Sequence, residues 1–200
     1  MEIEVWSRKE GAEVSTVHPT AKLGKGVYVG EGVWIGADVT VGAYTTIYGE
    51  VILHERVSVG EHVYIGPRAA IGEDVHVGHS TRINGWATLQ RGASIGDSVC
   101  IGHGATIGEG CVIPTTADHL VLGPGGSRDA YLTITRFPEP RFSTGCRSLG
   151  REAFIAAVKE RHTFRALDMA NSLPVNAQSL RWYRWAVEVA DSWLKSREGR

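Results

Sequence analysis

The feature that most constrains this chain is a valine, isoleucine or leucine that recurs every six residues over half of the sequence. The series starts at Val17, ends at Ile113 and has no exception in seventeen positions. The fourth residue after each aliphatic is small or valine, and the residue directly after it is glycine in eleven cases. A period of six fits neither an alternating strand nor a 3.6-residue helical turn. It indicates short strands joined by tight corners.

The repeat predicts a stack of triangular coils. Three six-residue units close one coil of eighteen residues, so residues 17–118 make about 5.7 coils. Stacked coils form parallel sheets, with the aliphatic and small positions inside and the variable positions outside. We expect the recurrent glycine to supply corner backbone angles that other residues avoid.

The runs LGKGVYVGEGVWIGADVTVG (23–42) and ASIGDSVCIGHGATIGEGCVI (93–113) resemble those of the hexapeptide-repeat acyltransferase superfamily. The resemblance implies a mainly β chain built on a left-handed parallel β-helix, assembled as a homotrimer. It also implies acetyl-CoA or another acyl-CoA as co-substrate, with no metal expected. The implied activity is transfer of an acyl group to a hydroxyl or amine of a sugar or nucleotide-sugar, at a site between protomers. Acetyl is the acyl group favoured.

The segments on either side of the repeat are predicted to close its ends. Residues 1–16 form an N-terminal cap, and residues 17–118 the β-helix domain. Residues 119–147 form a β extension, with an exit strand in 120–129 and a hairpin of 130–136 and 141–147. This extension resembles uncharacterised bacterial and phage members of the superfamily, which implies no activity.

Residues 148–200 are expected to be helical. One helix begins near Ser148 or Gly150, a short one lies in 163–170, and another spans about 176–196. The last helix carries an apolar stripe at helical spacing, expected to pack on the β-helix or a neighbouring protomer: Trp182, Trp185, Val189 and Trp193.

Composition excludes several classes of function. The net charge of −1 offers no basic excess for nucleic acid. No run approaches the roughly 18 apolar residues of a membrane span, and the N-terminus lacks the apolar stretch of a signal peptide. Three cysteines make no disulfide framework. We therefore expect a cytoplasmic protein that binds itself and a small molecule, with no nucleic acid or membrane partner.

The segment DVHVGHSTRING (74–85) holds the sharpest candidates for catalysis. In UDP-sugar acyltransferases of the superfamily a catalytic histidine sits in a similar stretch. Carried over by position, His79 is the general base and His76 its supporter. The base takes a proton from the attacking hydroxyl or amine and passes it to the departing thiolate.

Further residues are candidates for binding the substrate. His103 lies 24 residues after His79, at an equivalent corner of the adjacent face, so the two are expected to converge across a threefold interface. Asn84, Trp86 and Arg82 lie on outward positions nearby. In LGPGGSRDA (122–130) a glycine-rich turn and Arg128 suggest phosphate binding.

Two other functions remain open. The second enzymatic resemblance is to γ-class carbonic anhydrases, where Val77-Gly78-His79 matches but Asn84 stands where a histidine is expected. Zinc would then use His54 and His79. The second class is a non-catalytic trimer that binds a small anion such as a nucleotide, supported by outward aromatic residues and by four arginines: Arg68, Arg82, Arg91 and Arg128.

Overall fold

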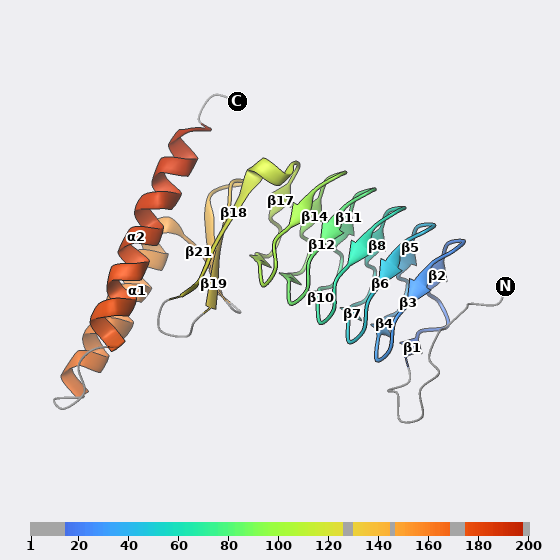
Figure 1. Ribbon diagram of the computed structural model, residues 1–200, viewed down its shortest axis with the longest axis horizontal. Coiled ribbons are helices and arrows are strands. Elements are labelled where there is room, and N and C mark those ends of the chain that lie inside the picture. The colour runs from blue at the N-terminus through green and yellow to red at the C-terminus, as the bar shows by residue number, and fades with distance from the viewer. Residues whose placement is uncertain (1–14, 126–129, 145–146, 169–174, 198–200) are drawn as a thin grey trace.

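The computed structural model describes residues 15–125, 130–144, 147–168 and 175–197, and arranges them along one long axis (Figure 1). A parallel β-solenoid occupies the N-terminal part, followed by an antiparallel sheet and two helices. The mainly β fold predicted from the repeat is confirmed. The predicted N-terminal cap lies, apart from its last two residues, outside the described part of the chain.

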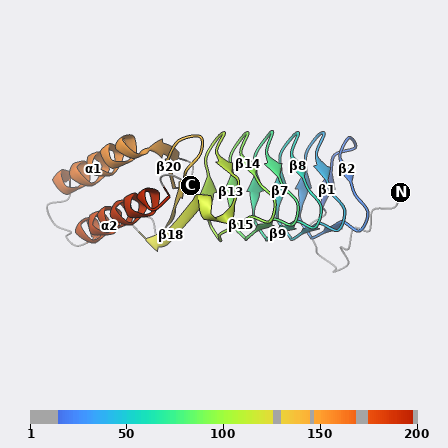
Figure 2. The ribbon, with the colours of Figure 1, turned by 90° about the horizontal axis from the view of Figure 1, so that it is seen from above.

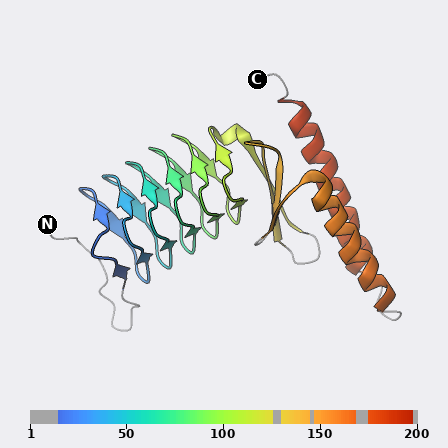
Figure 3. The ribbon, with the colours of Figure 1, turned by 180° about the vertical axis from the view of Figure 1, so that it is seen from behind.

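The solenoid has three faces, each a parallel sheet of two-residue strands (Figure 3). Face 1 contains β1 (Thr16–Val17), β4 (Trp34–Ile35), β7 (Ile52–Leu53), β10 (Ala70–Ile71), β13 (Thr88–Leu89) and β16 (Thr106–Ile107). Face 2 contains β2 (Lys22–Leu23), β5 (Thr40–Val41), β8 (Ser58–Val59), β11 (His76–Val77), β14 (Ser94–Ile95) and β17 (Val112–Ile113). Face 3 contains β3 (Tyr28–Val29), β6 (Thr46–Ile47), β9 (Tyr64–Ile65), β12 (Arg82–Ile83) and β15 (Cys100–Ile101).

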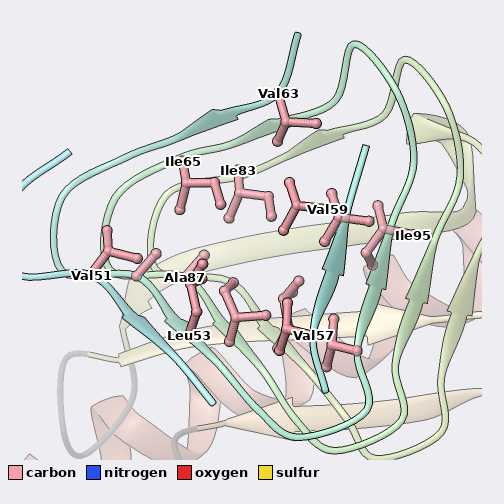
Figure 4. Packing of buried hydrophobic residues seen from close by; sticks show 14 of the residues in the cluster. Val51, Leu53, Val57, Val59, Val63, Ile65, Ile83, Ala87 and Ile95 are labelled. Carbon is pink, nitrogen blue, oxygen red and sulfur yellow. The ribbon is translucent and has the colours of Figure 1, made fainter. Parts of the chain in front are cut away.

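Every strand pairs with the strand one coil away, so each residue faces its equivalent eighteen positions on. Val77, for example, pairs with Val59 on one side and Ile95 on the other. The second residue of each strand points inward, and from Val29 to Ile113 these side chains are at most 4% exposed. Figure 4 shows several of them, such as Leu53, Ile65 and Ile83, in the interior together with residues of the second inward position, such as Val51 and Ala87. Full burial of one such side chain contributes about 1.5–3 kcal/mol.

The recurrent glycine has a different cause from the one expected. In the corners from residue 26 to residue 110 the left-handed backbone conformation falls two residues later, where Asp38 (φ 57°) and Trp86 (φ 61°) adopt it without being glycine. The glycine itself is required by close approach between coils. A Cβ on Gly66 would lie 2.5 Å from the backbone nitrogen of Gly85 in the next coil. The repeat therefore selects glycine for its missing side chain, not for its backbone freedom.

An antiparallel sheet closes the C-terminal end of the solenoid. After a short 3₁₀ turn, η1 (Thr116–Asp118), it runs through β18 (His119–Gly125), β19 (Ala130–Thr135), β20 (Arg141–Thr144) and β21 (Arg147–Gly150). The exit strand and the hairpin of the prediction are confirmed as β18, β19 and β20. Of the two helix starts expected, the one near Gly150 agrees with α1, which begins at Arg151, and the one near Ser148 is wrong, because residues 147–150 form β21 and pair with β20.

The two faces of this sheet are chemically different. Thr133, Thr135 and Ser143 are fully buried on the side of the solenoid, where the Thr106 amide donates to Thr133 Oγ1 at 2.9 Å. The other side is apolar, and Phe142 stacks on Phe154 at 5.3 Å. Strand alternation thus gives the sheet a polar contact with the last coil and an apolar contact with the helices.

Helices α1 (Arg151–Asp168) and α2 (Val175–Lys195) lie side by side on the far side of the sheet (Figure 2). Helix α1 continues through the region where a separate short helix was expected. The predicted aromatic stripe is correct in part: Trp182 and Trp193 pack against a hydrophobic core, but this core belongs to the sheet and the helices and not to the solenoid. Among the described side chains of α2, Ala186 and Ala190 are fully buried, whereas Trp185 is 49% exposed. The small side chains of Ala186 and Ala190 let the helix approach the sheet closely. Trp185 precedes Ala186 in the sequence, so it lies outside the helix face that these two alanines share.

Candidate functional site

A shallow groove runs along face 2 of the solenoid, parallel to the stacking axis. It has a volume of about 440 Å³ and is open to solvent. Both predicted catalytic histidines, His76 and His79, line it. The remaining lining residues belong to the strands and corners of the three coils before them: Lys22, Leu23, Gly24, Thr40, Val41, Gly42, Ser58, Val59, Gly60 and Glu61.

The parallel register sets the order of the polar side chains in the groove. His76 pairs with Ser58, Ser58 with Thr40, and Thr40 with Lys22. These four residues are the first residues of β11, β8, β5 and β2, and their side chains all point outward. The groove therefore carries a row of polar groups with histidine at one end and lysine at the other.

His79 is held at the corner after β11 by contacts with both neighbouring coils. The amide of Glu61 donates a hydrogen bond to His79 Nδ1 at 3.1 Å. The amide of His79 donates to Asp97 Oδ1 at 2.6 Å. Because Nδ1 accepts a hydrogen bond, the neutral imidazole carries its proton on Nε2. His79 therefore presents a donor, and not a free lone pair, at Nε2.

His76 differs from His79 in its contacts. Its side chain is exposed, and no described residue forms a hydrogen bond or an ion pair with its ring. Either ring nitrogen can therefore accept a proton from a bound molecule. The two histidines share one groove in complementary states, one fixed as a donor and one available as an acceptor.

The predicted substrate-binding residues lie elsewhere within a single chain. Arg82, on face 3, places its guanidinium over the ring of Tyr64 at 4.4 Å. Asn84 donates to the carbonyl oxygen of Ile101 at 2.8 Å. His103 occupies the same position in its six-residue unit as His79, but it lies in the corner after face 3. Its ring contacts Tyr131 edge-on, with the ring centroids 5.9 Å apart. None of these residues lines the groove of His76 and His79.

The arginines predicted to bind an anion do not gather either. Arg68 pairs with Glu50 at 2.7 Å and lies over the ring of Trp86. Arg91 pairs with Asp74 at 3.5 Å. Arg128 lies outside the described residues. In one chain, therefore, Arg68, Arg82 and Arg91 already have partners and do not form a common anion site.

The zinc alternative gains no support from the described part of the chain. His54 follows a strand of face 1, whereas His79 follows a strand of face 2, and the ring of His54 packs on Trp34 at 5.6 Å. Among the described residues no group of three or more histidine, cysteine, aspartate or glutamate side chains is placed to hold a metal ion.

Three charged residues at or beside the groove were not predicted from the sequence: Lys22, Glu61 and Asp97. Each is linked to a predicted histidine by the eighteen-residue coil repeat. Glu61 and Asp97 lie eighteen residues before and after His79, and Lys22 lies three coils before His76. Applying the coil period to each candidate histidine would have found all three.

Comparisons with known proteins address the repeat and the fold. A model of the family "bacterial transferase hexapeptide (six repeats)" matches residues 15–49 and 32–67. A mutant of perosamine N-acetyltransferase from Caulobacter crescentus, solved in complex with CoA and GDP-perosamine, is 26% identical with a TM-score of 0.51. That likeness covers 51% of this chain and 49% of that chain, so the chain matches about half the length of this enzyme.

Two further solved structures resemble the chain more weakly. The acetyltransferase domain of PglB from Neisseria gonorrhoeae is 20% identical, with a TM-score of 0.21 over 50% of this chain and 54% of that chain. A hexapeptide transferase family protein from Anaplasma phagocytophilum is 16% identical, with a TM-score of 0.27 over 79% and 93%. No curated protein matches the chain. Neither described helix has the length and apolar character needed to cross a bilayer.

Proposed function

Because the chain is a hexapeptide-repeat β-solenoid protein, we propose that it is an acyltransferase that uses acyl-coenzyme A, acetyl-CoA first of all. The acceptor is a hydroxyl or amine of a sugar or nucleotide-sugar. The observation that carries the proposal is the groove on face 2, where His76 and His79 lie together in complementary hydrogen-bonding states. The likeness to a sugar N-acetyltransferase solved with CoA supports the same reaction class.

The geometry favours an exchange of the roles expected for the two histidines. His76, with a free ring, takes the proton as the acceptor oxygen or nitrogen attacks the thioester carbonyl carbon. The new bond to carbon forms, the carbon–sulfur bond breaks, and the proton passes to the leaving thiolate. His79, with its proton on Nε2, donates a hydrogen bond to a substrate oxygen at the same end of the groove.

Release of free thiol from acetyl-CoA, measured against a panel of amino sugars and nucleotide-sugars, tests the proposal. We expect His76→Gln to lower kcat by about 10²–10⁴-fold, the usual contribution of a general base. His62→Gln is the matched control, because His62 stacks on Tyr44 at 5.3 Å and does not line the groove. Wild-type turnover in His76→Gln would contradict the assignment. A larger loss in His79→Gln than in His76→Gln would return the base to His79.

We also propose that the active protein is a homotrimer with the site between protomers. The aromatic row on face 3 supports it: Tyr28 and Tyr48 are each 41% exposed, and Tyr48 packs on Tyr64 at 5.1 Å. A second chain on this face would remove that apolar surface from water. It would also bring Arg82, Asn84, Trp86 and His103 of one chain towards the groove of another. Sedimentation equilibrium should then give three times the chain mass of 21.7 kDa, and a monomer would refute the assembly.

A further inference from the structure

The groove on face 2 extends well beyond its histidines, and its other end carries a lysine. We propose that Lys22, with the hydroxyls of Thr40 and Ser58, forms a subsite for a phosphate group of an extended substrate whose reacting end lies at His76. The identity of the reacting end rests on the proposed function. The phosphate subsite itself depends only on the groove.

The register fixes how far the two ends of the groove lie apart. Lys22, Thr40, Ser58 and His76 occupy equivalent positions on four successive coils. Neighbouring strands are about 4.8 Å apart, so the Lys22 and His76 backbones are separated by about 14 Å. A small acceptor cannot span that distance, whereas a substrate with a phosphate-bearing arm can.

The charges along the groove favour an anion only at the Lys22 end. Lys22 is exposed and forms no ion pair with any described residue. The carboxylate that lines the groove belongs to Glu61, which occupies the position equivalent to His79 in the preceding coil. An anion is therefore attracted towards Lys22 and repelled from the histidine end, which gives a bound substrate one direction.

The surface between the two ends suits an extended arm. Gly24, Gly42 and Gly60 line the groove without side chains, because a Cβ at each would collide with the next coil. Their amides already donate to carbonyl oxygens of that coil, so they offer no anion nest. The polar contacts must come from Thr40, Ser58 and the Lys22 ammonium, a compact charge suited to phosphate.

Direct binding measurements test the subsite without requiring turnover. Inorganic pyrophosphate and coenzyme A are titrated into the wild-type protein and into Lys22→Gln, Lys22→Arg and Lys25→Gln at low salt. Lys25 is the matched control, because it is an exposed lysine of the same coil that does not line the groove. We expect Lys22→Gln to weaken binding of both probes about tenfold, Lys22→Arg to retain most of it, and Lys25→Gln to stay near wild type. No binding of pyrophosphate to the wild type, or equal affinities for the two glutamine variants, would overturn the subsite.

Kinetics then identify the substrate that carries the phosphate. A tenfold rise in KM for acetyl-CoA alone in Lys22→Gln assigns the subsite to the acyl donor, and a rise for the acceptor alone assigns it to the acceptor. If binding depends on Lys22 but the wild type cleaves no thioester, the subsite stands and the acyltransferase function fails. If the wild type is active and Lys22→Gln matches it in binding and in both KM values, the function stands and the subsite is wrong.

Discussion

The solenoid and the C-terminal cap, defined as β18–β21 with α1 and α2, are stabilised in different ways. In the solenoid each buried side chain meets its equivalents in the coils above and below, as Ile65 meets Ile47 and Ile83. In the cap every contact is made once: Phe142 stacks on Phe154, and Arg151 holds Asp191 through two hydrogen bonds of 2.7 and 2.6 Å. One region repeats a small set of contacts, whereas the other depends on a few individual ones.

This difference has consequences for stability and for function. Stability in a repeat stack is approximately the sum of coil terms and interfaces between neighbours, so damage in one coil stays local. The cap has a single small core, which includes Leu132, Ile134 and Phe142, so one substitution affects all of it. The solenoid can consequently vary its outward residues, as the groove on face 2 shows, without losing its fold.

The largest expected effect is that of Phe142→Ala in the cap. Phe142 is fully buried between the sheet and α1, and truncation of a buried phenylalanine costs about 3–5 kcal/mol. We expect amide hydrogen exchange in α1 and α2 to accelerate, while the strands from β4 to β14 keep their protection.

Ile65→Ala, in the middle of the solenoid, is the control for this comparison. It removes a comparable buried side chain, and we expect faster exchange in the coils around β9 with little change in the helices. If either variant loses protection in both regions together, the molecule is one cooperative unit and the distinction between the regions fails.

The period of the sequence explains why the solenoid was predicted so much better than the cap. A residue such as Ile83 faces inward because of its rank in a six-residue unit, and that rank is visible in the sequence. No such rule places Thr133, which is polar and fully buried because it meets the Thr106 amide. The cap strand β21 and the exposure of Trp185 likewise depend on single tertiary contacts.

The candidate site falls between these two cases. The spacing of His76 and His79 placed both on one groove, because both belong to the same coil. The tautomer of His79 could not be predicted, since it depends on a hydrogen bond from the Glu61 amide in the preceding coil. The role of Lys22 was also hidden, because 54 residues of sequence separate it from His76.

An intermediate effect is expected from alanine at the recurrent glycine of the solenoid. A Cβ at Gly66 would lie 2.5 Å from the Gly85 nitrogen, so Gly66→Ala must push two coils apart. We expect a loss of about 1–3 kcal/mol in urea unfolding. At Gly150 in the cap an added Cβ meets nothing within 4 Å, so Gly150→Ala should change stability by about 0.5 kcal/mol or less. Equal losses in the two variants would contradict close approach between coils as the reason for the recurrent glycine.

The smallest expected effect is that of removing one ion pair from each region. Hydrogen bonds from Arg151 lower the pKa of Asp191 in the cap, and hydrogen bonds from Arg56 lower the pKa of Asp74 on the solenoid. A folded-state pKa below the unfolded value stabilises the protein above the ordinary carboxyl pKa of about 3.9, and this stabilisation is lost as the pH falls through the lower folded value. Asp191→Asn should therefore cost about 1 kcal/mol at pH 7 and progressively less below about pH 4, a modest figure because Arg151 is partly exposed.

Thermal unfolding of Asp191→Asn and Asp74→Asn between pH 7 and pH 2.5 distinguishes the two regions. Asp74 is more exposed than Asp191, and its partner Arg56 also contacts Glu55 and Glu73, so other carboxylates remain when Asp74 is removed. In the cap Arg151 also contacts Glu152 at 2.6 Å, but Glu152 belongs to α1 itself, so the carboxylate that joins α2 to Arg151 is that of Asp191. We expect the difference in melting temperature between wild type and Asp191→Asn to close on acidification. The corresponding difference for Asp74→Asn should be smaller at every pH. A larger loss for Asp74→Asn would mean that the corner charges stabilise the coils more than a single pair stabilises the helices.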